Sequence, residues 1–209
     1  MLVFTPELSG ERDALAILES VLPWIDMVQV RPKPVGLEGT GPTEARAARD
    51  WCRAVLARVA ESGRTLPVVV NDRVDVARLL ADEGLAGVHL GQTDCPWKDA
   101  RAQLGPDLLV GLSTHDVTQV AQAIDFDVDY LGFGPVFPTA TKGFDRGMSP
   151  EATWVASEAS DVPVFPIGGI GLSNAQELAH IGRVAVGSAL LASDDAPGAA
   201  RALRGLLER

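Results

Sequence analysis

Short apolar, β-branched segments alternate with longer amphipathic segments along the whole 209-residue sequence. Each short segment has the length and composition of a buried strand, and each longer one repeats apolar residues at helical spacing. Eight strands are predicted, at residues 2–5, 27–30, 68–71, 87–90, 108–112, 130–133, 164–167 and 184–186. Eight helices are predicted, at residues 11–22, 43–61, 74–83, 97–104, 117–124, 150–159, 173–180 and 196–207. The alternation favours an α/β fold with a parallel sheet, because parallel strands are joined by crossover helices.

Eight consecutive β/α units within about 200 residues fit a closed parallel barrel with its helices outside. We therefore expect residues 1–209 to form a single (β/α)8 TIM-barrel domain. An open, doubly wound sheet is the alternative. Against it, the first strand is followed by Thr5-Pro6-Glu7-Leu8, which lacks the G-x-G-x-x-G of a dinucleotide-binding turn. Residues 34–42, rich in Gly and Pro, are expected to form a flexible loop over the barrel mouth.

The net charge of −10 and the pI near 4.7 argue against non-specific binding to nucleic acid or to an anionic membrane, since both need cationic surface. No run approaches the roughly 20 apolar residues of a membrane span, and no basic segment precedes a long apolar one at the N-terminus. We expect a soluble cytoplasmic protein. Its two cysteines, Cys52 and Cys95, lack CxxC spacing, so neither a disulfide nor a zinc site is expected.

Polar side chains gather on one face of the second predicted strand. Strand alternation places Gln29, Arg31 and Lys33 on the same side. Such a set is costly on a buried strand unless its members meet a ligand or one another. The alternative is that Arg31 pairs with a carboxylate at the barrel end. The 18 cationic residues include only three lysines, Lys33, Lys98 and Lys142, of which Lys98 is expected to be a surface charge.

Carboxylates follow two neighbouring strands. Asn71 and Asp72 come at the end of the third strand, and Asp94 follows the fourth. Because the loops after barrel strands share one end, Asp72 and Asp94 are expected to bind Mg²⁺ together, with water and substrate phosphates completing its coordination. The alternative is that Asp72 caps the helix that begins near Val74, or pairs with Arg73.

Hydroxyls, a lysine and glycines follow strands six to eight. Thr139, Thr141 and Lys142 can contact phosphate oxygens, although a solvated turn has a similar composition. Gly168-Gly169 and Gly187-Ser188 follow strands seven and eight, where glycine lets an anion approach backbone N–H groups. Together the two glycine segments predict a phosphate site.

Two histidines and a serine follow or lie within the fourth and fifth strands. Ser113 and His115 are expected to line the site, with Asp116 as the N-cap of the next helix. His89 lies inside a strand and is expected to be a core histidine with its hydrogen bonds satisfied. A hydrolase triad built from Ser113 and His115 is rejected, because no complete hydroxyl, base and acid constellation accompanies them.

Six blocks of this sequence, in order, resemble the thiamine phosphate synthase family. They are Gln29-Val30-Arg31-Pro32-Lys33, Val70-Asn71-Asp72-Arg73, Gly87-Val88-His89-Leu90-Gly91-Gln92-Thr93-Asp94, Gly111-Leu112-Ser113-Thr114-His115, Gly132-Phe133-Gly134-Pro135-Val136-Phe137-Pro138-Thr139-Ala140-Thr141-Lys142 and Ile167-Gly168-Gly169-Ile170. The chain departs from the family pattern at Pro32, where an acidic residue is common, and at Thr93, where glutamate is expected.

The resemblance implies a Mg²⁺-dependent transferase that joins hydroxymethylpyrimidine diphosphate to a thiazole phosphate, giving thiamine phosphate and pyrophosphate. It implies that the metal is held by Asp72 and Asp94. The pyrimidine diphosphate would be contacted by Gln29, Arg31, Lys33, Asn71, Ser113 and Lys142. The thiazole phosphate would be held by Thr139, Thr141, Gly169, Gly187 and Ser188. Catalysis is expected from Arg31, Lys33, Ser113 and Lys142 without a protein nucleophile, since the reaction resembles a dissociative substitution.

Three other functions are compatible with a phosphate-binding barrel. A thiazole tautomerase shares the barrel but would not need Asp72, Asp94 and the lysines. A Schiff-base aldolase would need a desolvated lysine, whereas Lys142 follows a threonine-rich loop beyond its strand. A non-catalytic barrel that senses phosphorylated precursors is the third. The sequence gives no prediction of oligomeric state.

Overall fold

A computed structural model of the chain describes residues 1–33, 42–138 and 147–208. Seven parallel strands form one sheet in which each strand pairs with the next along the chain. The strands are β1 (Leu2–Phe4), β2 (Val28–Val30), β3 (Val68–Asn71), β4 (Gly87–Leu90), β5 (Leu109–Thr114), β6 (Tyr130–Phe133) and β7 (Val164–Pro166). Purely sequential parallel pairing is the order of a barrel and differs from that of a doubly wound sheet.

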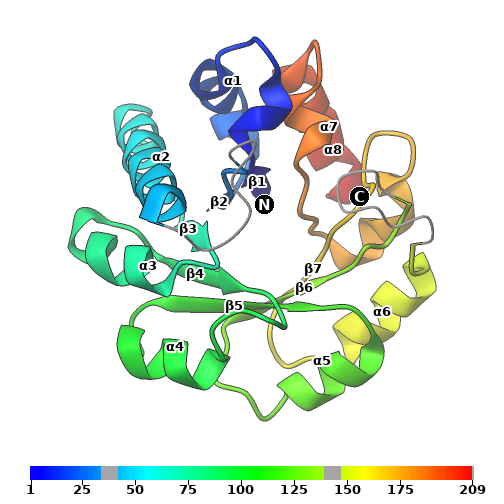
Figure 1. Ribbon diagram of the computed structural model, residues 1–209. Helices are drawn as coiled ribbons and strands as arrows, with labels where there is room; N and C mark the ends of the chain where they lie inside the picture. The colour runs from blue at the N-terminus through cyan, green and yellow to red at the C-terminus, as the bar shows by residue number, and fades with distance from the viewer. Residues whose placement is uncertain (34–41, 139–146, 209) are drawn as a thin grey trace.

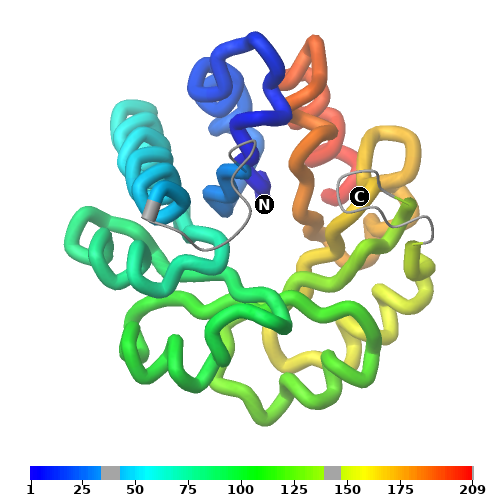
Figure 2. Tube along the Cα trace, viewed as in Figure 1, coloured from blue at the N-terminus to red at the C-terminus, as the bar shows by residue number. Residues whose placement is uncertain are grey.

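A short segment closes the sheet between β7 and β1. Ala185 bridges to Ile167 on one side, and Val186 bridges to Leu2 on the other. The Val3 N–H donates to the carbonyl of Val186 at 2.8 Å. In Figure 2 the blue start of the chain accordingly lies beside the orange segment. The eighth strand predicted at 184–186 is thus reduced to two bridges, and the fold is the expected TIM barrel.

Helices lie outside the strands and follow one another around the barrel, so that α8 packs beside α1 (Figure 1). The α-helices are α1 (Ala14–Val21), α2 (Pro42–Glu61), α3 (Val74–Leu80), α4 (Trp97–Leu104), α5 (Val117–Ala123), α6 (Pro150–Glu158), α7 (Ser188–Leu191) and α8 (Ala196–Leu207). Shorter 3-10 helices are η1 (Pro6–Ser9), η2 (Leu22–Trp24), η3 (Ala81–Glu83) and η5 (Ala175–Ile181). None of the helices in the described part of the chain is long and apolar enough to cross a membrane.

The helices after β7 differ from the sequence prediction. The helix predicted at 173–180 forms the 3-10 helix η5, and its preceding residue Asn174 does not cap it. Instead Asn174 accepts from the Gly171 N–H and donates to the Gly169 carbonyl, so its side chain stabilises the loop after β7. The short helix α7 was not expected. The loop predicted at 34–42 lies outside the described residues, apart from the start of α2 at Pro42.

The barrel separates two apolar clusters by strand alternation. Side chains such as Val28 and Val30 point outward and belong to the large cluster between strands and helices. Met27, Val69 and Tyr130 form a smaller cluster, with Leu109 and Phe165 packed against it. Gln29 lies between Val28 and Val30 and is only 3% exposed, so the residues facing into the barrel change from apolar to polar toward the ends of the strands.

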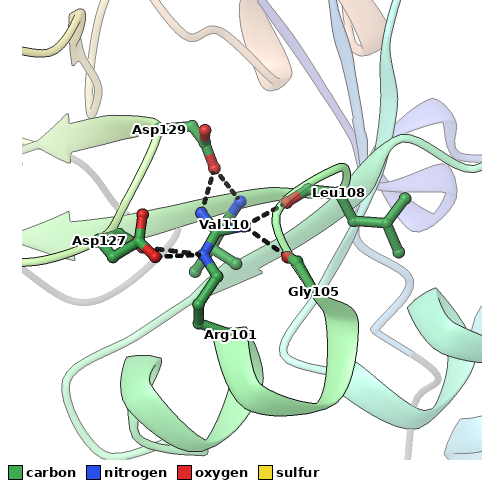
Figure 3. Close-up of polar contacts among 6 residues, drawn as sticks. All are labelled: Arg101, Gly105, Leu108, Val110, Asp127 and Asp129. Carbon is green, nitrogen blue, oxygen red and sulfur yellow. Dashed lines mark hydrogen bonds and ion pairs between the residues drawn. The ribbon is translucent and has the colours of Figure 1, made fainter.

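At the opposite end of the barrel, where β5 and β6 begin, Arg101 makes hydrogen bonds and an ion pair with several neighbouring groups (Figure 3). From α4 it donates to the carbonyls of Gly105 and Leu108 at 2.9 and 2.7 Å and pairs with Asp129 at 2.7 Å. Asp129 also accepts from the Val110 N–H at 2.7 Å. The guanidinium therefore links a helix to the starts of two strands, because its planar donors can reach several acceptors at once.

Candidate active site

One pocket opens at the end of the barrel where the strands finish, and it collects polar side chains from several strands. Seven of the predicted site residues line it. They are Gln29, Arg31, Asn71, Ser113, Gly169, Gly187 and Ser188. Its apolar wall includes Leu8, Phe165 and Ile170. The pocket thus combines polar groups that can orient a ligand with a wall that can exclude water.

Arg31 directly follows β2 and, by strand alternation, lies on the same side as Gln29. Its backbone N–H donates to the Phe4 carbonyl at 2.8 Å, which continues the β1–β2 ladder past the last strand residue. Burial lowers the pKa of the Arg31 guanidinium, and the negative charges of Asp72 and Asp94 act in the opposite direction. No direct ion pair of Arg31 occurs among the described residues, so the alternative in which Arg31 pairs with a carboxylate is not observed. Lys33 is exposed at the end of the same described segment.

Asp72 stands at the turn between β3 and α3. Its φ of 63° lies in the left-handed region, and its N–H donates to the His89 carbonyl at 2.8 Å. The amide of Asn71 donates to its carboxylate. α3 has no side-chain cap, and Arg73 pairs with Asp75 through Nε and Oδ1 at 2.8 Å. The alternative in which Asp72 caps α3 is therefore not observed.

Asp94 closes a tight turn after β4. Its Oδ2 accepts from the Gly91 N–H at 2.7 Å, and its own N–H donates to the Gly91 carbonyl at 3.4 Å. Asp72 and Asp94 follow the neighbouring parallel strands β3 and β4, so both lie at the end of the barrel where these strands finish.

The oxygen donors of Asp72 and Asp94 can be compared with those that a Mg²⁺ site requires. No group of three or more His, Cys, Asp or Glu side chains suited to a metal occurs in the described ranges. Two oxygen donors beside a site for phosphates match the way Mg²⁺ is usually bound, with water and substrate oxygens filling the remaining positions. The donors present therefore fit Mg²⁺ and do not fit a complete all-protein cage.

A glycine cradle follows β7. Gly168 and Gly169 have φ values of 97° and 65°. A Cβ at Gly169 would lie 2.5 Å from the Pro138 carbonyl oxygen, so the loop after β6 approaches as closely as glycine allows. The Phe137 N–H donates to the Gly168 carbonyl at 3.1 Å, which holds the two loops together. Thr139, Thr141 and Lys142 come directly after Pro138 and lie outside the described residues.

Gly187 and Ser188 follow the closing segment beside β7 and line the same pocket. Gly187 precedes α7, and a Cβ there would lie 3.3 Å from the Val3 carbonyl oxygen. Ser188 is exposed and lines the pocket mouth. Because the loops after β7 and after the closing segment meet at one pocket, their backbone N–H groups can serve one anion.

His89 and Ser113 form the inner part of the pocket. His89 Nε2 lies 2.9 Å from Ser113 Oγ, and Nδ1 lies 3.1 Å from the Tyr130 hydroxyl. The expectation that His89 has its hydrogen bonds satisfied is confirmed, yet it also lines the pocket. His115 lines the pocket as expected, with Nδ1 2.7 Å from the Gly134 carbonyl oxygen.

Tyr130 is a polar pocket residue that sequence reasoning did not assign to the site. It is the first residue of β6, is 3% exposed and lines the inner end of the pocket. The available signal was that it is the only tyrosine of the chain and stands in a strand of otherwise apolar or glycine residues. Asp116, by contrast, caps α5 as expected, accepting from the Gln119 N–H at 2.8 Å.

Closed parallel strands and polar groups gathered at their carboxyl ends define a (β/α)8 barrel with the pocket at the end where active sites of this fold lie. The family model described as thiamine monophosphate synthase matches residues 1–190, and the chain belongs to this family.

Two relatives and one solved structure show the extent of the similarity. The chain is 37% identical to a thiamine-phosphate synthase of Rhodopirellula baltica, over 92% of this chain and 50% of that protein. It is 35% identical to a thiamine-phosphate synthase of Haloquadratum walsbyi, over 99% of this chain and 90% of that protein. The solved thiamine phosphate pyrophosphorylase of Pyrococcus furiosus superposes with a TM-score of 0.79 at 28% identity, covering 99% of this chain and 94% of that one. The chain spans about half the length of the Rhodopirellula relative and of two Synechococcus relatives.

Proposed function

We propose that this chain joins hydroxymethylpyrimidine diphosphate to a thiazole phosphate and releases thiamine phosphate and pyrophosphate in a Mg²⁺-dependent reaction. The observation that carries the proposal is the position of Arg31, which lines a barrel pocket within the electrostatic influence of both Asp72 and Asp94. A cationic side chain in the pocket, with two carboxylates at neighbouring strand ends, suits a substrate that brings both a diphosphate and a metal ion. The names of the relatives point to the same reaction.

The two substrates would occupy two sides of the pocket. Gln29, Arg31, Lys33, Asn71, Ser113 and Lys142 would contact the pyrimidine diphosphate. Thr139, Thr141, Gly169, Gly187 and Ser188 would hold the thiazole phosphate. The glycine cradle supports this division, since it lies across the barrel from β2 and β3 and lets backbone N–H groups approach an anion.

The residues would act by stabilising charge and by positioning the two substrates. When the bond between the pyrimidine methylene and the diphosphate breaks, negative charge develops on the leaving pyrophosphate. Arg31, Lys33 and Lys142 would stabilise that charge, and preorganised cations are most effective where water is excluded. Mg²⁺ bound by Asp72 and Asp94 would supply further positive charge at the diphosphate.

Pocket shape would protect the carbocation-like pyrimidine. Its apolar wall, which includes Leu8, Phe165 and Ile170, would limit the access of water to that cation. Holding the thiazole nitrogen in line with the methylene carbon would then make its attack effectively unimolecular. Neither Ser113 nor His89 needs to act as a nucleophile or as a base in this scheme.

The test is to incubate the purified chain with both phosphorylated heterocycles and Mg²⁺ and to measure thiamine phosphate by its fluorescent oxidation product, together with pyrophosphate. Both products should appear in equal amounts and only with metal present. A thiazole tautomerase would change the thiazole phosphate without consuming the pyrimidine, and a non-catalytic phosphate-binding barrel would bind either compound and release no pyrophosphate. Either outcome would contradict the proposal.

A further inference from the structure

A buried polar network forms the inner end of the pocket and includes Ser113, one of the residues assigned to the diphosphate. It joins three side chains from three strands, His89 of β4, Ser113 of β5 and Tyr130 of β6. His89 and Tyr130 are 7% and 3% exposed. Polar groups buried to this degree are costly unless they bond to one another or to a ligand.

The barrel is shaped to hold the two aromatic rings of this network. His89 and Tyr130 stack with their centroids 5.4 Å apart and an interplanar angle of 27°. A Cβ at Gly111 would lie 2.1 Å from the Tyr130 ring, and one at Gly132 would lie 3.2 Å from the His89 ring. Two neighbouring strands thus carry glycine where the rings need room. The ring positions are therefore fixed by backbone and not by adjustable side chains.

The direction of the hydrogen bonds can be worked out from Tyr130. Burial raises the pKa of its phenol, so the hydroxyl keeps its proton. The hydrogen-bond partner of that hydroxyl among the described residues is His89 Nδ1, 3.1 Å away. A buried O–H without an acceptor is costly, so the Tyr130 hydroxyl donates its proton to Nδ1.

A neutral imidazole carries one proton, so a nitrogen that accepts leaves the other as the donor. If Nδ1 accepts from Tyr130, Nε2 donates to Ser113 Oγ across 2.9 Å. Because the Ser113 oxygen then receives a hydrogen bond from below, its own proton is directed elsewhere. Ser113 lines the pocket, so a bound substrate is the acceptor within reach.

We infer that Tyr130 and His89 form a one-directional hydrogen-bond chain that makes the Ser113 hydroxyl a donor to the substrate. His89 and Tyr130 are positioning residues in this chain, because they act through Ser113. The identity of the acceptor, an oxygen or ring nitrogen of the pyrimidine diphosphate, rests on the proposed function. The direction of the chain does not, since it is a property of the protein without substrate.

Nitrogen-15 NMR of the histidine side chains tests the direction in the substrate-free protein. The chain has three histidines, so the His89 signal can be assigned by its loss in His89→Gln. We expect a neutral ring with the proton on Nε2. In Tyr130→Phe, which removes only the hydroxyl, the Nε2–H preference should weaken while the His115 signal stays unchanged. A wild-type ring with its proton on Nδ1, or an unchanged tautomer in Tyr130→Phe, would overturn the inference.

A double-mutant cycle on kcat/KM tests the consequence for the reaction. Tyr130→Phe should lower kcat/KM about five- to tenfold when Ser113 is present, the effect of one hydrogen bond. In the Ser113→Ala background the same change should have less than a twofold effect, because no hydroxyl remains to be oriented. Equal losses in both backgrounds would show that Tyr130 acts only through stability. If no thiamine phosphate forms at all, the proposed function fails and the NMR result still decides the direction of the chain.

Discussion

The Asp94 carboxylate accepts a 2.7 Å hydrogen bond from the N–H of Gly91, three residues before it. One carboxylate oxygen therefore fixes the turn after β4, and the carboxylate also acts on the pKa of Arg31. An amide at this position could still accept from Gly91 through its oxygen. The structural role and the charge of Asp94 can thus be separated by a single substitution.

Asp94→Asn should leave the melting temperature nearly unchanged and lower Mg²⁺-dependent kcat on the order of a hundredfold, the usual size of losing one electrostatic group in a closed site. The Mg²⁺ concentration for half-maximal rate should rise as well. Asp99→Asn is the matched control, since Asp99 is exposed on α4. If Asp94→Asn had wild-type kcat and metal dependence, Asp94 would have no role in the metal site.

Gly169→Ala should weaken the thiazole phosphate side of the pocket. An added Cβ would lie 2.5 Å from the Pro138 carbonyl oxygen, and the φ of 65° is unfavourable for alanine. We expect a loss of about 1–3 kcal/mol in the free energy of unfolding, together with a higher KM for thiazole phosphate. Thermal unfolding and steady-state kinetics measure the two effects. In Gly171→Ala no atom lies within 4 Å of the new Cβ, so this control should change neither.

Much of this site could be predicted from the sequence because strand ends in a parallel barrel share one face. Arg31 and Ser113 needed only the correct strand assignment to be brought to the same pocket. The contact between His89 and Tyr130 was not predictable in the same way, since it depends on the register of strands β4 to β6 and on the space left by Gly111 and Gly132. The sequence predicted a helix at residues 173–180 but not that it would be the 3-10 helix η5, because apolar spacing does not distinguish an α-helix from a 3-10 helix over seven residues.

Lys142→Ala should slow coupling far more than Lys98→Ala. Lys142 follows the threonines expected at the phosphate, and removal of its charge would leave the departing pyrophosphate less stabilised. Lys98 is exposed, with its ammonium 5.4 Å from the centre of the Trp97 ring, so its loss should change kcat less than twofold. Kinetics of both variants at saturating Mg²⁺ provide the comparison. Equal effects would remove the role proposed for Lys142.

Arg101→Ala should destabilise the barrel without a direct effect on the pocket. The substitution leaves the carbonyls of Gly105 and Leu108 and the Asp129 carboxylate without their shared donor. Because Asp129 is about one-third exposed, we expect a loss on the order of 2 kcal/mol in the free energy of unfolding, less than for a fully buried pair. Arg49→Ala, which removes a surface pair with Asp50, should cost less than about 1 kcal/mol in the same urea titration. Similar losses in the two variants would show that Arg101 is no more than another surface charge.

Cys52 and Cys95 should differ sharply toward a thiol-alkylating reagent at pH 8. Cys52 is fully buried, and burial raises the pKa of its thiol to about 12, whereas Cys95 is partly exposed. Alkylation should therefore modify Cys95 alone in the folded protein, and Cys95→Ser should take up no label until it is unfolded, as mass spectrometry would show.

The raised pKa of the Cys52 thiol in the folded protein also makes stability depend on pH. Above the ordinary thiol pKa of 9.0 the unfolded chain loses the Cys52 proton while the folded chain keeps it, so the contribution of Cys52 to the free energy of unfolding should fall between about pH 9 and 12. Cys52→Ala should flatten that part of the pH dependence, and labelling of Cys52 in the native protein would contradict its burial beneath the helices.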